Sequence, residues 1–92
     1  MPEMVFRVRW PDASVQQCYS PSTVVEEFFV PGTSYPVAEF VVRSRTALTQ
    51  ASERVRRTYG FACAQAAAQL ADIEARAKSF ADGAVLVEGF ER

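Results

Sequence analysis

The residues best suited to chemistry in this chain are its two cysteines, Cys18 and Cys63. A thiolate is a strong nucleophile, and a nearby helix start lowers the pKa of a thiol because aligned backbone amides stabilise the negative charge. Cys63 falls in the first turn of an expected helix, and Cys18 lies just before another expected helix start. If the two thiols are neighbours, they can form a redox pair or bind a soft metal ion.

A structural role is the simpler interpretation of both cysteines. The chain contains no histidine, so it lacks the usual general base, the usual partner of a cysteine nucleophile and the commonest zinc ligand. The two cysteines do not form a CxxC pair, and two thiolates are too few for a closed zinc site. Because free cysteine is among the most often buried residue types, we expect Cys18 to be mainly structural. We expect no catalytic residue, no metal site and no cofactor, with a thiol-based redox protein as an alternative.

A second candidate site is the group of arginines on the long expected helix. Arg54 and Arg57 are three residues apart and share a helix face, where two guanidinium groups suit a phosphate or a carboxylate. Ser20 and Ser22 lie at an expected helix start, where hydroxyls and free backbone amides can hold an anion. Solvated charges and helix caps explain the same residues more simply. A small-molecule or anion sensor that uses these four residues is therefore an alternative function.

Two expected strands open the chain and form a hairpin. Apolar residues at every second position of residues 4–10 predict a half-buried strand. A turn that contains Pro and Asp leads to a returning strand over residues 14–19. A three-residue loop places Cys18 in the core, whereas a four-residue loop places Val15 and Tyr19 there instead. Both registers remain open at this stage.

Three expected helices follow the hairpin. Ser20 as N-cap and Pro21 as first helical residue predict a short helix that ends near residue 29. The segment Ser34–Pro36 repeats this pattern and opens a long helix, whose apolar spacing runs over residues 37–59 and ends before a glycine. A further helix over about residues 62–78 is rich in alanine, which allows close packing in an antiparallel helical hairpin.

A final strand over residues 84–88 completes the order β-β-α-α-α-β. A two-stranded ribbon is marginal by itself, so we expect the final strand to join it in a mostly antiparallel three-stranded sheet. Helices on one face of this sheet give a two-layer α+β fold. The 92 residues of the chain fit one α+β domain, residues 1–92.

Composition and edges limit the partners of the chain. Its 10 basic and 11 acidic residues give a net charge of −1, so nothing in the charge favours nucleic acid or an anionic membrane surface. The apolar runs are too short to span a bilayer, and residues 1–4 lack a signal-peptide pattern, so we expect a cytoplasmic protein. Open sheet edges favour a homo-oligomer such as a dimer, or a partner protein. A monomer with short, charged edges is the alternative.

Seven short motifs resemble those of a known family. They are RWPD (9–12), CYSPS (18–22), PGTSYP (31–36), SRTAL (44–48), ASERV (51–55), YGFAC (59–63) and QLADIEARA (69–77). Together they are similar to short nitrogen-starvation response proteins encoded beside nitrilase in a bacterial gene cluster. One departure is Ala13, where the family pattern prefers Gly.

The resemblance implies a setting of nitrogen limitation and nitrile-related metabolism, but no reaction and no ligand residue. We therefore expect a non-catalytic accessory or interaction protein that works with a protein of the nitrilase gene neighbourhood.

Overall fold

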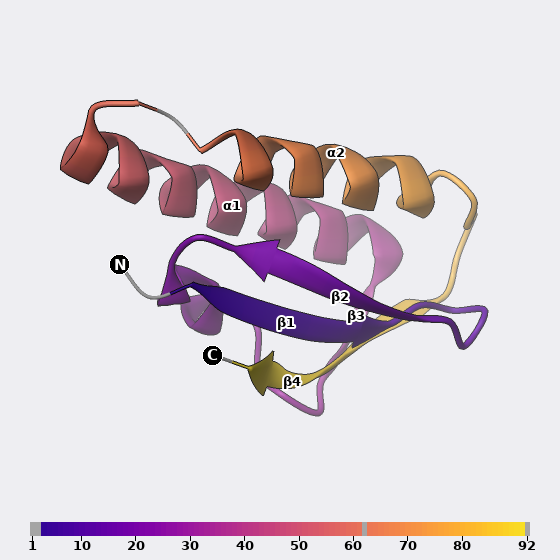
Figure 1. Cartoon of the computed structure of the whole chain (residues 1–92). Helices are drawn as coiled ribbons and strands as arrows, with labels where there is room; N and C mark the ends of the chain where they lie inside the picture. The colour runs from indigo at the N-terminus through magenta and orange to yellow at the C-terminus, as the bar shows by residue number, and fades with distance from the viewer. Residues whose placement is uncertain (1–2, 62, 92) are drawn as a thin grey trace.

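The chain folds into a sheet covered on one face by an antiparallel pair of helices (Figure 1). The computed structural model describes residues 3–61 and 63–91, so the expected helix start at Ala62 and the first two residues fall outside it. In the described residues the elements are β1 (Met4–Arg9), β2 (Val15–Ser20), the 3₁₀ helix η1 (Thr23–Glu27), β3 (Ser34–Pro36), α1 (Val37–Tyr59), α2 (Ala64–Ala77) and β4 (Ala84–Glu91).

The strand order is β2-β1-β4-β3, and each neighbouring pair is antiparallel. The prediction that the last strand joins the hairpin is confirmed, because β4 pairs with β1. The prediction of three strands is wrong, since the described residues form four. The additional strand is β3, which pairs with β4 from Ser34 opposite Leu86 to Pro36 opposite Ala84. Ser34 was expected to cap a helix, but it begins a strand too short to show a period-two pattern.

The prediction of three α-helices also needs correction, because the described residues contain two α-helices and the 3₁₀ helix η1. The N-cap of η1 is Ser22, whose hydroxyl oxygen accepts a hydrogen bond from the backbone amide of Val24 at 3.3 Å. Ser20, the predicted cap, is instead the last residue of β2. Both serines have a hydroxyl that could cap a helix. Because Ser20 pairs with Met4 as part of β2, Ser22 is the residue that caps η1.

The long helix α1 ends where the sequence predicts. Gly60 adopts the left-handed conformation with φ 86°, and its amide donates to the carbonyl of Arg56 at 2.8 Å. At the other end of α1 no side chain caps the helix. Instead, the amide of Val37 donates to the carbonyl of Gly83, just before β4, at 3.2 Å. The start of α1 is thus held by the sheet.

The hairpin has the three-residue loop, one of the two registers that the sequence left open. The amide of Trp10 donates to the carbonyl of Ser14 at 2.8 Å, and Cys18 lies opposite Phe6. Ala13 closes the loop with φ 70°, in the left-handed region. A glycine adopts this conformation without strain, whereas alanine does not.

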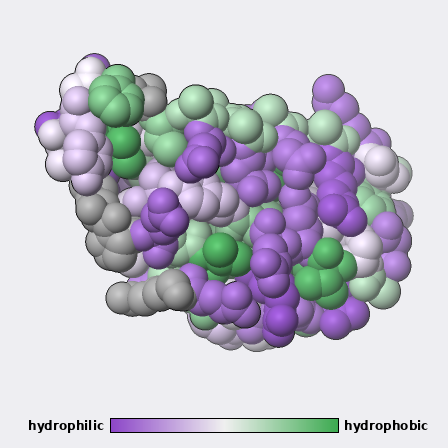
Figure 2. Space-filling view, in the orientation of Figure 1, coloured by the Kyte–Doolittle hydropathy of each residue, from purple (hydrophilic) through white to green (hydrophobic). Residues whose placement is uncertain are grey.

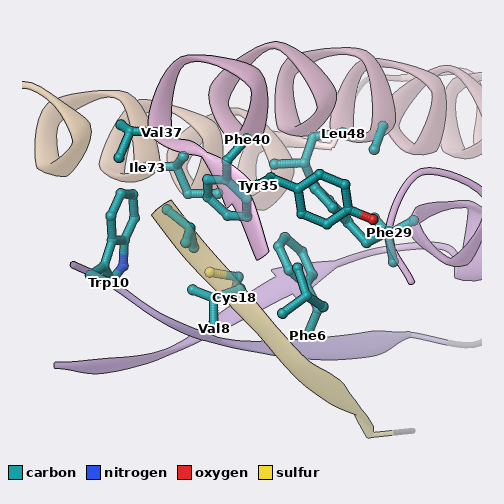
Figure 3. Close-up of a cluster of buried hydrophobic side chains, with 14 of the residues drawn as sticks. Phe6, Val8, Trp10, Cys18, Phe29, Tyr35, Val37, Phe40, Leu48 and Ile73 are labelled. Carbon is teal, nitrogen blue, oxygen red and sulfur yellow. The ribbon is translucent and has the colours of Figure 1, made fainter. Parts of the chain in front are cut away.

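Trp10 joins the sheet to the helices. Its ring stacks on Phe80 at 5.6 Å between centroids and meets the edge of Phe40 at 5.5 Å. Its indole N–H donates to the side-chain oxygen of Gln16 at 2.8 Å, so the one polar atom of the ring is satisfied. Figure 3 shows Trp10 below Phe40 and Ile73, at one end of the buried cluster.

The free edge of β2 is covered by polar side chains of α2. The side-chain oxygen of Gln69 accepts the backbone amide of Tyr19 at 2.9 Å. Further along, Asp72 accepts from the side-chain amide of Gln16 at 2.5 Å, and Arg76 donates to the hydroxyl of Ser14 at 2.8 Å. A side chain of α2 therefore satisfies one backbone amide of this edge. The other edge of the sheet is the three-residue strand β3.

Replacing Ala13 with Gly should stabilise the protein. Glycine adopts the left-handed conformation without the strain of roughly 1–2 kcal/mol that alanine carries there. The greater conformational freedom of glycine in the unfolded chain offsets roughly 0.5–1 kcal/mol of this gain. We expect Ala13→Gly to raise the free energy of unfolding by about 0.5–1 kcal/mol, measured by urea denaturation. At the same position, Ala13→Val should lower it, because β-branched residues avoid positive φ. Equal stabilities for the three proteins would contradict a strained loop.

Candidate functional site

Cys18 lies in the hydrophobic core and is fully buried. Figure 3 shows its sulfur between the side chains of Val8 and Phe6. Burial, and to a smaller extent the nearby carboxylate of Asp72, raise the pKa of the Cys18 thiol to about 12. At neutral pH this thiol is protonated and out of contact with solvent, so it has the properties of a small apolar side chain.

Cys63 is in a different environment, at the start of α2. It is half-buried and occupies the N-cap position, one residue before the helical turn in which the sequence placed it. Its amide donates to the hydroxyl of Ser52 at 3.3 Å. Burial, with smaller effects from Glu3 and Cys63, raises the pKa of the neighbouring Tyr19 phenol. Cys63 therefore faces Tyr19, whose side chain leaves β2 on the side opposite that of Cys18.

The described part of the chain contains neither a metal-binding cluster nor a membrane-spanning helix. Across residues 3–61 and 63–91, no three His, Cys, Asp or Glu side chains come together in a way that could hold a metal ion. Among the helices of these same residues, none combines the length and apolar character needed to cross a membrane.

Arg54 and Arg57 lie side by side on α1, as their spacing predicts. With Gln50 and Glu53 they line a shallow hollow of about 280 Å³. Arg54 lies 3.6 Å from the carboxylate of Glu27 in η1. Among the arginines of α1, Arg57 alone forms no ion pair within the described residues. The hollow therefore carries an exposed guanidinium group that forms no salt bridge with the described residues, although its charge acts on the nearby Glu53.

The hydroxyls of Ser20 and Ser22 are not exposed beside this hollow. Both residues are buried, with 0% and 2% of their surfaces exposed. The Ser20 hydroxyl donates to the carbonyl of Ser22 at 2.6 Å, and the Ser22 hydroxyl accepts from Val24. These bonds stabilise the link from β2 to η1, so the two serines act here as structural residues.

A groove between α1 and α2 is the feature that sequence reasoning missed. It has a volume of about 490 Å³ and is lined mainly by aliphatic side chains: Val37, Ala38, Val41, Val42 and Ala77, with Lys78 at its end. Arg45 and Glu74 also line the groove, and their side chains form an ion pair with an N–O distance of 2.6 Å. Val42 is 56% exposed although it is aliphatic. Its position off the buried stripe of α1 is the signal that the sequence offered.

The comparison with known families decides where this chain belongs. Residues 5–90 match the family described as "Nitrogen starvation-induced protein NitG". The chain belongs to the NitG family. The match runs from β1 into β4 and confirms the resemblance to nitrogen-starvation proteins that the motifs carry. The NitG description gives a condition of induction and no reaction. No curated protein and no solved structure matches the chain.

The two thiols of this NitG-family chain should react at very different rates. With a pKa of about 12, only about one Cys18 thiol in 10⁵ is ionised at pH 7. We expect a thiol reagent at neutral pH to label one cysteine, Cys63, and to reach Cys18 only after denaturation. The reaction is followed by absorbance and mass spectrometry.

Two variants assign the fast reaction. Cys63→Ser should abolish it, and Cys18→Ala should leave it unchanged. Fast labelling of native Cys63→Ser protein would show that Cys18 is accessible, against its placement in the core.

Proposed function

We propose that this NitG-family chain is a non-catalytic accessory protein that binds other proteins in the cytoplasm during nitrogen starvation. The observation that carries the proposal is the state of its reactive groups. The buried thiol of Cys18 is protonated, the chain has no histidine to act as a base, and the groove between α1 and α2 is lined mainly by aliphatic side chains. Such a surface suits binding better than proton transfer.

The arginine side of α1 is the surface that we propose for the partner. The exposed Arg57 has no ion pair within the described residues, and Arg54 beside it is only loosely paired with Glu27 at 3.6 Å. Two guanidinium groups on one helix face suit an acidic segment of another protein, because arginine binds carboxylates through paired hydrogen bonds. The resemblance of the motifs leads us to propose that this protein is encoded in the nitrilase gene neighbourhood.

A small-molecule sensor is the second candidate, and the hollow beside Arg54 and Arg57 is the observation that favours it. A phosphorylated or carboxylated metabolite could bind the same two guanidinium groups. The burial of Ser20 and Ser22 removes two of the four ligands expected for such a site. A thiol-based redox role is the third candidate and would rest on Cys63, since Cys18 is buried and protonated.

A pull-down from nitrogen-starved cells tests the accessory role. The tagged wild-type chain should recover a specific acidic partner, and Arg57→Gln should reduce the recovery severalfold because it removes the unpaired guanidinium group. Arg7→Gln is the matched control: it makes the same change on the sheet, away from α1, where Arg7 lies 3.0 Å from the carboxylate of Glu88. Equal recovery by all three proteins, or no partner at all, would refute the proposed surface.

Thermal melts distinguish the sensor from the accessory protein. A metabolite present at a hundred times its Kd stabilises the native state by about 2.7 kcal/mol, which raises the Tm of a domain of this size by roughly 10–20 °C. A shift of this size that disappears in Arg57→Gln but not in Arg7→Gln would favour the sensor. No shift across a set of phosphorylated and carboxylated metabolites would exclude it for that set.

A further inference from the structure

The helix α2 presents its small apolar residues to solvent. Its polar residues Gln69, Asp72 and Arg76 bond to β2 and to Ser14 just before it. The side of α2 that faces away from the buried Ala66 and Ile73 forms a ridge of exposed alanines: Ala64, Ala67, Ala68, Ala71 and Ala75. Figure 2 shows this ridge as pale green residues along the top of the molecule, over α2. The outer side of a solvated helix is normally charged, and this one is not.

The groove between α1 and α2 lies beside the alanine ridge. Its first part, about 490 Å³, contains the exposed Val42. A second part of about 170 Å³ continues along the helix pair and is lined by Leu48, Ala66 and Leu70, among others. The alanine ridge and the groove together form one face, which we call the outer helix face.

Two exposed aromatic residues project at the opposite end of this face. Tyr59 and Phe61 flank the Gly60 that ends α1, and they are 56% and 67% exposed. With an α-helical rise of 1.5 Å per residue, Tyr59 lies about 25 Å along α1 from Val42. The aromatic pair therefore cannot fill the first part of the groove in its own chain.

We propose that the outer helix face is the interface of a homodimer, in which Tyr59 and Phe61 of each copy pack into the groove beside Val42 of the other. A two-fold axis through the middle of the face produces this contact twice, because residue i then meets residue j and residue j meets residue i. Between the two contacts, the alanines allow the helices of the two copies to approach closely.

The features of this face select a second copy as its occupant. Projecting aromatic residues and a groove lie at opposite ends of one surface, so a two-fold axis between them brings the aromatic residues of each copy to the groove of the other. Its charges are largely balanced within the chain, since Arg45 pairs with Glu74 and Arg56 with Glu53. Two equal copies therefore meet with little charge repulsion.

The size of the molecule also fits a dimer. Its longest dimension is 38 Å, so a contact that extends along the helix pair has room for the roughly 800 Å² per partner that a stable interface buries. The proposed contact does not use Arg57 and does not depend on the proposed function.

Light scattering coupled to gel filtration tests the dimer on the purified chain. Wild type should have twice the mass of one chain at micromolar concentration. Val42→Glu and Phe61→Ser should each shift it to one chain mass. Val15→Glu is the control and should remain dimeric, because Val15 is also an exposed valine (45%) but lies in β2, outside the outer helix face. Circular dichroism and thermal melts establish that each variant is folded.

A cross-link tests the specific contact. In a Cys63→Ser background, Val42→Cys combined with Phe61→Cys should give a disulfide-linked dimer on a non-reducing gel, and each single variant should give far less. The two positions are too far apart in one chain for a disulfide, which needs Cα atoms within about 7 Å.

A wild-type monomer at every concentration, or a dimer that Val42→Glu and Phe61→Ser leave intact, would overturn the inference. Arg57→Gln should stay dimeric, so failure of the proposed partner surface and failure of the dimer can be told apart.

Discussion

The outer edge of β2 determines much of this structure, because its backbone faces α2 instead of another strand. A backbone amide left without a partner in a protein interior costs about 1–3 kcal/mol, and at Tyr19 that partner is the side chain of Gln69. Asp72 and Arg76 extend the contact to Gln16 and Ser14. These bonds fix the rotation of α2 about its axis, so Ile73 enters the core and the alanines face outward.

The same contact accounts for the chemical character of the core. With α2 held against β2, the core face of the hairpin is covered, and Cys18 is sealed between the sheet and the helices. The carboxylate of Asp72, which accepts a hydrogen bond from Gln16 at the strand edge, also disfavours a negative charge on the sulfur of Cys18. The interaction that completes the fold therefore also removes one of the two thiols from use. What remains available for function lies on the surface.

Sequence patterns predicted the elements whose signals are local. The period-two spacing of β1 and the helical spacing of α1, with Gly60 at its end, were sufficient for both. The strand β3 was missed because only its pairing with Leu86 and its neighbours makes it a strand. The register of the hairpin remained open because Ala13 adopts a conformation that favours glycine.

The candidate sites also divide into those that a local sequence pattern predicts and those that depend on long-range packing. The proximity of Arg54 and Arg57 followed from their spacing on one helix. The burial of Ser20, Ser22 and Cys18 depends on packing between distant segments, which no local pattern reports. The groove beside Val42 forms between two helices and has the same long-range origin.

The two faces of the molecule differ in the charges that they expose, and the difference has a structural cause. On the open face of the sheet, a bulge between Arg7 and Val8 shifts the register with β4 and leaves Glu88 as the extra residue. Its carboxylate lies 3.0 Å from Arg7 and 2.8 Å from Arg9. Exposed ion pairs of this kind add little stability, but they keep a sheet face polar and discourage pairing with other molecules.

The outer helix face has no comparable set of charges along α2, because the polar residues of that helix are used on the edge of β2. A helix has a limited number of positions. Those that satisfy a strand edge cannot also keep the outward side solvated. In this NitG-family chain, the polar positions used on β2 leave an apolar surface on the outward side of α2, and this is the surface that we propose for the dimer.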